Sequence, residues 1–171
     1  MLIVFGGLPG TGKTTLARAV AKERHATYLR IDTIEQALRS SGMIEGDVGP
    51  AGYLIAYALA EANLRLGQSV VADCVNPLRI TRDAWRKVAS DASCRVIEIE
   101  VICSDVAEHR RRVETRSVDL AGLIPPTWEQ VMEREYESWH RPRIALDTSN
   151  LSTTEALIEL RSRIEDACSK N

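Results

Sequence analysis

At 171 residues the chain has the size of one domain, and it is long enough to bury a core without disulfides or a structural metal. Hydrophobic residues make up 44% of it and charged residues 27%, proportions that exclude a disordered protein and a membrane protein. The formal net charge of −2 supplies no overall positive field and weighs against a polynucleotide substrate. We expect a single domain over residues 1–171.

Short apolar runs rich in β-branched residues alternate with longer segments of helical periodicity. The runs predict strands at 2–5, 27–31, 69–72, 95–102 and 144–146. The periodic segments predict helices at 13–24, 33–40, 50–66, 77–92, 105–116, 127–140 and 153–167, the last capped by Ser152 or Thr153. Strands that alternate with helices of this length imply parallel crossovers, so we expect a three-layer α/β sandwich with about five strands.

Two stretches between these elements are typical of mobile loops. Residues 40–52 contain four glycines and a proline, and residues 117–126 lie between two predicted helices and end in two prolines. We expect the second loop to act as a lid. The apolar start of the chain is interrupted by Gly6 and Pro9 before a signal-peptide core or a membrane span can form, which predicts a cytoplasmic protein without membrane contact.

Residues 7–14 match the pattern G-x-x-x-x-G-K-[ST] in full, between a predicted strand and a predicted helix. Glycines in such a phosphate loop turn backbone N–H groups toward phosphate oxygens, and the helix adds the positive end of its dipole. Lys13 can reach the β- and γ-phosphates of a nucleoside triphosphate, and the Thr14 hydroxyl can bind Mg²⁺. The expected nucleotide contacts are Gly7, Gly10, Thr11, Gly12, Lys13, Thr14 and Thr15.

Other features narrow the class of phosphate-loop protein. The guanine motif N-K-x-D of GTPases is absent from the sequence. A second GTPase motif, D-x-x-G, is matched at residues 119–122, but this match lies in a loop rather than at a strand end. Two flexible loops suit a small kinase, because a kinase has to close over its substrates and keep water from the γ-phosphate.

Asp32 and Asp73 each stand at the end of a predicted strand. In an open α/β sheet the carboxyl ends of the strands face the ligand crevice, so both carboxylates should look toward the phosphate loop. We predict that Asp32 orients an acceptor hydroxyl and accepts its proton, the alternative being an N-cap of the next helix. We predict that Asp73 holds Mg²⁺ directly or through water, the alternative being a cap or turn residue.

Arginines and tyrosines supply the remaining candidates. Arg112 and Arg116 are four residues apart and share one face of a predicted helix, and Arg116 stands at the mouth of the 117–126 loop, within reach of a transferring phosphoryl group. Arg79 and Arg82 follow the third strand and either grip an anionic part of the acceptor or face solvent. Tyr53 and Tyr57 share a helix face and line either an acceptor pocket or the core.

With these residues in hand, the chain resembles the small P-loop kinases that group near adenylate kinase. The stretch RIDTIEQAL is similar to the region after the second strand of chloramphenicol phosphotransferase-like enzymes, where the matching Asp deprotonates the acceptor hydroxyl, and this implies the same role for Asp32. The stretch VVADCVNPLRITRDAW is similar to polynucleotide 5′-kinase domains. Its matching positions are Asp73, Asn76 and Arg79.

The Arg-x-x-x-Arg pair is similar to the lid of this superfamily, which implies that Arg112 lies near the adenine and Arg116 near the phosphates. The resemblance also implies a P-loop NTPase α/β/α sandwich with strand order 2-3-1-4-5, and ATP and Mg²⁺ as co-substrates. It places Ser149 and Asn150 beside the adenine. Polynucleotide kinases generally carry an Arg where this chain has Glu35, and a carboxylate there repels a nucleic-acid phosphate.

The sequence therefore predicts a phosphotransferase that moves the γ-phosphate of ATP to a hydroxyl of a small-molecule acceptor. Lys13, Asp32 and Arg116 are the expected catalytic residues. The expected acceptor contacts are Asp32, Tyr53, Tyr57, Asn76 and Arg79. Two alternatives stay open: a polynucleotide 5′-hydroxyl kinase, and a nucleotide-binding regulatory ATPase that signals to a protein partner.

Overall fold

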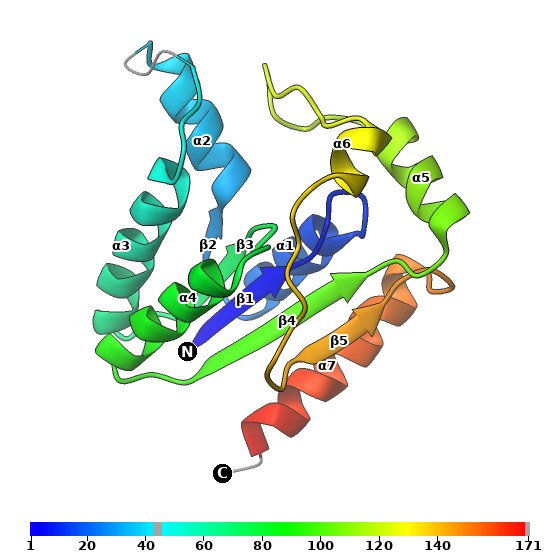
Figure 1. The fold of residues 1–171 in the computed structure, drawn as a ribbon. Coiled ribbons are helices and arrows are strands. Elements are labelled where there is room, and N and C mark those ends of the chain that lie inside the picture. Colours follow the sequence, from blue (N-terminus) through cyan, green and yellow to red (C-terminus); the bar gives the residue numbers. More distant parts are fainter. Residues whose placement is uncertain (43–45, 170–171) are drawn as a thin grey trace.

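The computed structural model describes residues 1–42 and 46–169, which form a five-stranded parallel sheet between two layers of helices (Figure 1). Three residues of the predicted 40–52 loop, 43–45, lie outside the described residues. The strand order is β2-β3-β1-β4-β5. The strands are β1 (Leu2–Gly6), β2 (Thr27–Arg30), β3 (Val70–Asp73), β4 (Val96–Ile102) and β5 (Ile144–Asp147). The predicted fold class and strand order are confirmed.

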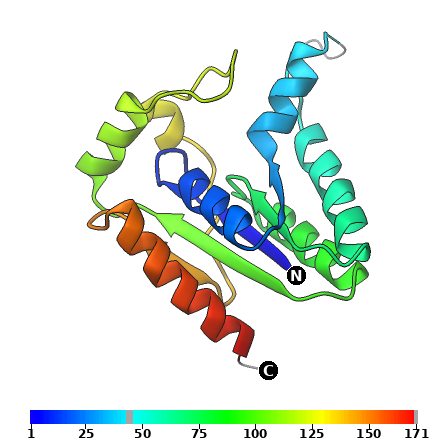
Figure 2. The same cartoon turned by 180° about the vertical axis from the view of Figure 1, so that it is seen from behind.

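Helices cover both faces of the sheet because alternate strand residues point to opposite sides. Ile3 and Phe5 pack toward α1 and α7, while Leu2 and Val4 pack toward α3 and α4 (Figures 1 and 2). The helices are α1 (Lys13–Glu23), α2 (Ile31–Ser40), α3 (Ala51–Arg65), α4 (Arg79–Asp91), α5 (Val106–Thr115), α6 (Trp128–Met132) and α7 (Thr153–Ser169).

The parallel register brings the ends of the first three strands to one edge of the sheet. Phe5 of β1 lies opposite Asp73 of β3, and Arg30 of β2 lies opposite the same Asp73. The loops that follow β1, β2 and β3 therefore meet at this edge, as the rule for open α/β sheets requires.

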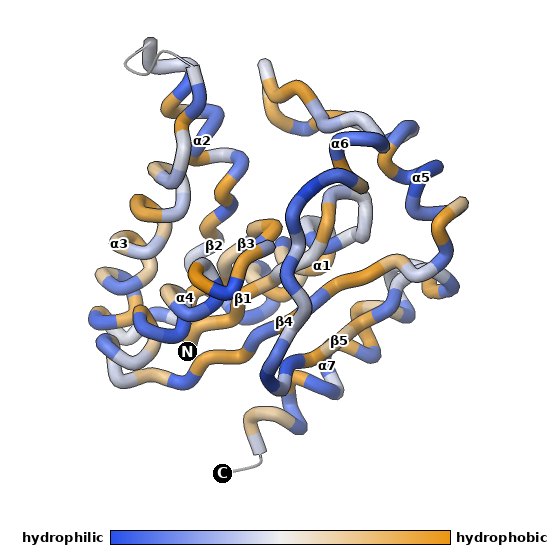
Figure 3. The backbone as a smooth tube through the Cα atoms, viewed as in Figure 1, coloured by the Kyte–Doolittle hydropathy of each residue, from blue (hydrophilic) through white to orange (hydrophobic). Residues whose placement is uncertain are grey.

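The prediction of a helix over 127–140 is wrong beyond Met132, where α6 ends after little more than one turn. The following residues 133–143 form an irregular strap that runs beside β4, and Figure 3 shows it as largely hydrophilic. Tyr136 donates its hydroxyl to Glu100 (3.2 Å), and Arg141 donates to both carboxylate oxygens of Glu98 (2.8 Å each). The buried carboxylates of Glu98 and Glu100 need hydrogen-bond donors, and the strap supplies them. The free energy gained by pairing these carboxylates outweighs the helix propensity of the segment.

Other local predictions fare better. The backbone N–H of Glu155 donates to the Ser152 hydroxyl, and the Ser152 N–H donates to the Glu155 carboxylate, so Ser152 is the predicted cap of α7. Among the described residues, no helix has both the length and the apolar character needed to cross a membrane.

Candidate functional site

The phosphate loop takes a conformation that glycine alone allows at several positions. Gly7, Gly10 and Gly12 have φ values of 139°, 87° and 90°. A Cβ on Gly7 would lie 2.2 Å from the carbonyl oxygen of Val101. Helix α1 begins directly after Gly12, whose lack of a side chain leaves the first N–H groups of the helix open. This cradle fits the oxygens of a phosphate group.

Side chains outside the loop hold its carbonyl groups. The Thr148 hydroxyl donates to the carbonyl of Thr11 (2.9 Å), and His109 Nε2 lies 2.8 Å from the carbonyl of Pro9. Since a carbonyl oxygen only accepts, Nε2 of His109 is the donor in this contact. The His109 ring packs edge-on against Trp128, so α5 and α6 together support the loop. The carbonyls of Pro9 and Thr11 are thus held from outside the loop, while the N–H groups of Gly7 and Thr11 donate to the carbonyls of Val75 (3.0 Å) and Leu8 (3.4 Å).

Asp73 is nearly buried at the end of β3, with 2% of its surface exposed. It accepts a hydrogen bond from the Tyr28 hydroxyl at 2.7 Å, and burial together with this neighbouring charge raises the pKa of Tyr28. The Thr14 hydroxyl and the Asp73 carboxylate are the oxygen ligands that Mg²⁺ prefers. Among the described residues, no group of three or more His, Cys, Asp or Glu side chains could hold a metal ion.

The alternative role predicted for Asp32, the N-cap of the next helix, is wrong. Helix α2 begins at Ile31 with Arg30 in the cap position, so Asp32 lies in the first turn. Its carboxylate accepts from Arg30 Nη2 at 3.1 Å and from Nε at 3.3 Å. The side chain keeps 39% of its surface exposed and lines a cavity. Asp32 is therefore held in place on one side and open on the other.

This cavity, of about 690 Å³, lies between α2, the phosphate loop and the lid, which we define as residues 117–126. Lys13, Asp32, Tyr53 and Arg116 line it, as do several charged residues that the sequence did not single out as ligands. Those are Arg30, Glu35, Arg39, Asp119 and Arg134. The lid contacts α2 directly, because a Cβ on Gly122 would lie 2.7 Å from the Gln36 amide nitrogen.

Arg116 and Arg112 lie one helical turn apart, because the Arg116 N–H donates to the Arg112 carbonyl at 3.2 Å, but of the two side chains only that of Arg116 lines the cavity. Helix α5 ends at Thr115, and Arg116 follows in an extended conformation with ψ of 138°. Arg116 Nε is buried with no hydrogen-bond partner among the described residues, and burial lowers the pKa of its guanidinium while Asp32 opposes the change. A buried N–H without an acceptor is a group that an anion would satisfy.

Arg112 points to the loop after β5. Its guanidinium donates to the Thr148 hydroxyl at 2.8 Å and to the Thr148 carbonyl at 2.9 Å. The next residue, Ser149, donates its backbone N–H to Asp147 at 3.0 Å. Partial burial raises the pKa of Asp147, but hydrogen bonds from Ser104 and Ser149 outweigh it and hold the pKa at about 2. Arg112 and the start of the 147–150 turn thus form one ordered corner beside the phosphate loop.

The predicted acceptor contacts differ in whether they line the cavity. Tyr53 lines the cavity and accepts the backbone N–H of Asn76 at 2.9 Å, and burial raises the pKa of its hydroxyl. Tyr57 instead donates to the Thr81 carbonyl and packs its ring on Trp85, so it belongs to the core. Neither Asn76 nor Arg79 is among the lining residues of the cavity.

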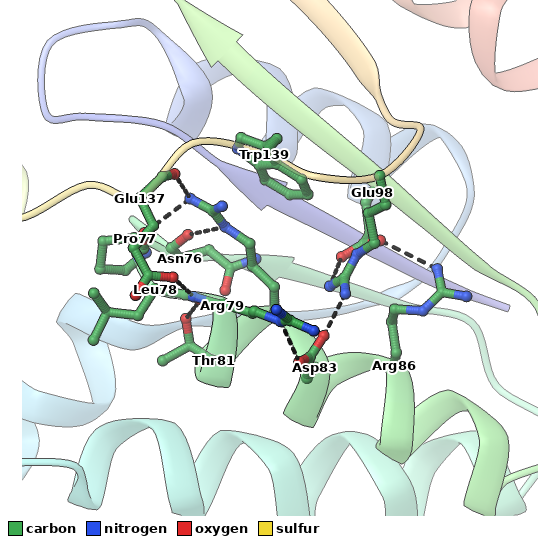
Figure 4. A network of polar contacts seen from close by, with 12 residues as sticks. Asn76, Pro77, Leu78, Arg79, Thr81, Asp83, Arg86, Glu98, Glu137 and Trp139 are labelled. Carbon is green, nitrogen blue, oxygen red and sulfur yellow. Dashed lines mark hydrogen bonds and ion pairs between the residues drawn. The ribbon is translucent and has the colours of Figure 1, made fainter.

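Arg82 has neither of the two roles considered for it. It is fully buried and donates to carbonyls of the α4 entry and of the strap, and Figure 4 shows Glu137 and Trp139 of the strap beside Asn76 and Pro77. The four acceptors are the carbonyls of Asn76 (3.0 Å), Pro77 (2.8 Å), Glu137 (2.8 Å) and Ser138 (3.3 Å). Its guanidinium also lies 4.2 Å from the ring centre of Trp139. Arg82 is a structural clamp.

A parallel sheet in this order, with a glycine-rich phosphate loop after its central strand, is the fold of the small P-loop kinases. A profile of the family described as "AAA domain" matches residues 2–139, and the chain belongs to that family. Uncharacterized proteins of Mycobacterium tuberculosis and Mycobacterium bovis are 35% identical over an alignment of 109 residues, and the match covers 57% of this chain. The match covers 22% of those relatives, so the chain spans about a fifth of their length.

Solved structures show the same fold at low sequence identity. The APS kinase of Mycobacterium tuberculosis, solved with AMPPNP and APS, has a TM-score of 0.71 and 20% identity over 96% of each chain. A sugar kinase of Janibacter has a TM-score of 0.71 and 18% identity, covering 96% of this chain and 94% of its own. Kti12 of Chaetomium thermophilum, solved with ADP-AlF3, has a TM-score of 0.70 and 22% identity over 98% of each chain.

Proposed function

We propose that this protein is a phosphotransferase that moves the γ-phosphate of ATP to a hydroxyl group of a small molecule. One observation carries the proposal: Lys13, Asp32 and Arg116 line the same cavity beside a glycine loop shaped for phosphate. A volume of about 690 Å³ lies within the usual range of small-molecule sites. Several structural relatives are named as kinases of small molecules, which supports a small-molecule acceptor.

In this proposal the donor lies across the phosphate loop. The N–H groups at the start of α1 and Lys13 bind its phosphates, while Arg112, Ser149 and Asn150 border its base. Thr14 and Asp73 would hold Mg²⁺, which would supply positive charge to the donor phosphates. The hydrogen bond from Tyr28 fixes the Asp73 carboxylate at the end of β3.

The acceptor lies on the opposite side, against α2. Asp32 accepts the proton of the acceptor hydroxyl. The hydroxyl oxygen forms a bond to the γ-phosphorus, and the bond between the γ-phosphorus and the bridging oxygen of the β-phosphate breaks. The unpartnered Nε–H of Arg116 donates to the transferring group, where negative charge shifts during the reaction. The lid at 117–126 closes the cavity against water.

The test is a screen of ATP consumption against alcohols, sugars, nucleosides, aminoglycoside and phenicol antibiotics, and a 5′-hydroxyl oligonucleotide. On the acceptor found, Asp32→Asn should lower kcat by about 100-fold or more, the usual contribution of a positioned base. Asp91→Asn is the matched control, since Asp91 pairs with Lys87 on the exposed side of α4. A wild-type rate for Asp32→Asn would remove Asp32 from this role, and transfer to the oligonucleotide alone would establish a polynucleotide kinase.

A further inference from the structure

Arg30 is a buried cation at the acceptor end of the cavity. It is the last residue of β2, keeps only 8% of its surface exposed and still lines the cavity. Its guanidinium donates to Asp32 through Nε and Nη2, and Nε lies 3.9 Å from Asp73. Arg30 thus stands between the carboxylate proposed as base and the carboxylate proposed to hold Mg²⁺.

The third partner of Arg30 comes from the lid. Arg30 Nη1 donates to both carboxylate oxygens of Asp119 at 2.9 Å, and Arg18 of α1 also pairs with this carboxylate. The Asp119 side chain keeps 40% of its surface exposed. Partial desolvation raises the pKa of Asp119, but the hydrogen bonds from Arg30 and Arg18 outweigh it and hold the pKa at about 2. The lid therefore carries a permanent anion into the acceptor side of the cavity.

The charges that line the cavity favour an anionic acceptor. Five cations face it, and three carboxylates oppose them. The cations are Lys13, Arg30, Arg39, Arg116 and Arg134, and the carboxylates are Asp32, Glu35 and Asp119. Arg134 has no ion-pair partner in the part of the chain that the structure describes. If the donor phosphates take Lys13 and Arg116, three of the lining arginines remain, and one of them, Arg39, pairs with Glu35 on its own helix. Asp119, the partner of Arg30, comes from the lid.

We propose that Arg30 binds an anionic group of the acceptor, a carboxylate or a phosphate, and that Asp119 occupies this position until the acceptor displaces it. The inference rests on the proposed function, because it takes Asp32 as the group that meets the acceptor hydroxyl. Asp119 meets the guanidinium at Nη1, and the oxygens of a substrate carboxylate or phosphate can accept from the same nitrogen.

The position of Arg30 also limits the shape of the acceptor. Its guanidinium lies 3.1 Å from the Asp32 carboxylate, so an anion on Arg30 and a hydroxyl on Asp32 are close neighbours. With ordinary hydrogen-bond lengths at both ends, about two to four bonds separate the anion from the reacting hydroxyl. Short hydroxy acids, sugar acids and phosphorylated polyols meet this condition.

The experiment measures binding rather than turnover. The nucleotide site is first saturated with a non-hydrolysable ATP analogue and Mg²⁺, so that the phosphate loop does not capture the probe. Glycerol, glycerate and glycerol 3-phosphate are then titrated into the wild-type protein and into Asp119→Asn, Arg30→Gln and Glu114→Gln variants. Glu114→Gln controls for the loss of one negative charge, because Glu114 pairs with Arg110 on the exposed side of α5.

The wild-type protein should bind one of the two anions more tightly than glycerol, and the preferred anion identifies carboxylate or phosphate. Asp119→Asn should tighten binding of that anion by about 5- to 20-fold, since it removes an internal competitor, and should leave glycerol unchanged. Glu114→Gln should change neither. Arg30→Gln should bring the three probes to similar affinities.

Equal binding of all three probes, or no effect of Asp119→Asn, overturns the inference. Asp119 lies on an exposed loop, so this variant decides the question even if Arg30→Gln fails to fold. Phosphate transfer to a neutral acceptor without anion binding would refute this inference alone. Anion binding without any phosphate transfer would refute the proposed function instead.

Discussion

Gly10 lies at a point of the phosphate loop where a side chain has no room. Its φ is 87°, and a Cβ would lie 2.6 Å from Val113 Cγ2 on α5. Gly67 has a similar φ of 81° but open space around its Cβ position. The two glycines therefore separate backbone strain from steric overlap.

We predict that Gly10→Ala lowers the free energy of unfolding by about 2 to 5 kcal/mol, because overlap with a packed side chain adds to the strain of a left-handed residue. Gly67→Ala should cost only the strain, about 1 to 2 kcal/mol. Chemical denaturation of both variants measures the difference. Equal losses would show that α5 yields to the new methyl group.

The role of a single residue could be predicted where that residue belongs to a motif with fixed spacing. Lys13 and Thr14 could be predicted as nucleotide contacts because spacing within the loop fixes their positions, and that role stays a prediction. The roles of Arg30 and His109 could not be predicted, since a single Arg at a strand end or a single His on a helix often has a purely structural role. His109 contacts the Pro9 carbonyl only because the fold brings together residues 100 positions apart.

At the scale of elements, Arg82 joins the strap to the entry of α4. Its guanidinium is the shared partner of four carbonyls, two on each segment. Arg79, three residues earlier, is exposed and pairs with Asp83 at 3.6 Å. The two arginines form a matched pair on one helix, one buried and one in solvent.

We predict that Arg82→Ala lowers the free energy of unfolding by about 3 kcal/mol or more, because several buried carbonyls lose their donor together. Arg79→Ala should cost less than about 0.5 kcal/mol, as exposed ion pairs contribute little. Denaturant unfolding gives both values, and amide exchange in residues 133–143 should rise in Arg82→Ala alone. A loss of stability without faster exchange in the strap would contradict the role of Arg82 as a clamp.

The error at the strap shows where periodicity fails. Residues 127–140 carry helical spacing, and α6 starts with the capping box of Thr127 and Gln130. The contacts that end the helix are made by Tyr136 and Arg141 with buried acids of β4, which are distant in sequence. Local patterns predict such a segment poorly because its conformation is set by partners on another strand.

At the scale of the whole molecule, the sheet could be predicted and the cavity could not. Strand order follows from alternating elements and from the resemblance to small kinases, both visible in the sequence. The cavity depends on how the lid lies against α2 and on which charged side chains turn inward. Glu35 is the clearest case, since the sequence placed it near the acceptor but gave no measure of its burial.

Glu35 makes the stability of the molecule depend on pH. Burial raises the pKa of its carboxyl, Arg39 opposes this, and the charges of Asp32 and Asp47 add to it. A carboxyl whose pKa is higher in the folded state favours folding below the unfolded pKa, which is 4.5, and this contribution is lost as pH rises through the folded pKa. At neutral pH the ionised Glu35 therefore opposes folding.

We predict that Glu35→Gln raises Tm relative to the wild-type protein at pH 7.5, and that the difference shrinks toward zero as pH falls to about 4, where Glu35 is protonated in both states. Glu61→Gln is the control, because Glu61 pairs with Arg65 on the exposed side of α3, and it should change Tm little at either pH. Thermal unfolding across this pH range measures both. A lower Tm for Glu35→Gln at pH 7.5 would mean that the ionised carboxylate stabilises the fold through Arg39 more than its burial costs.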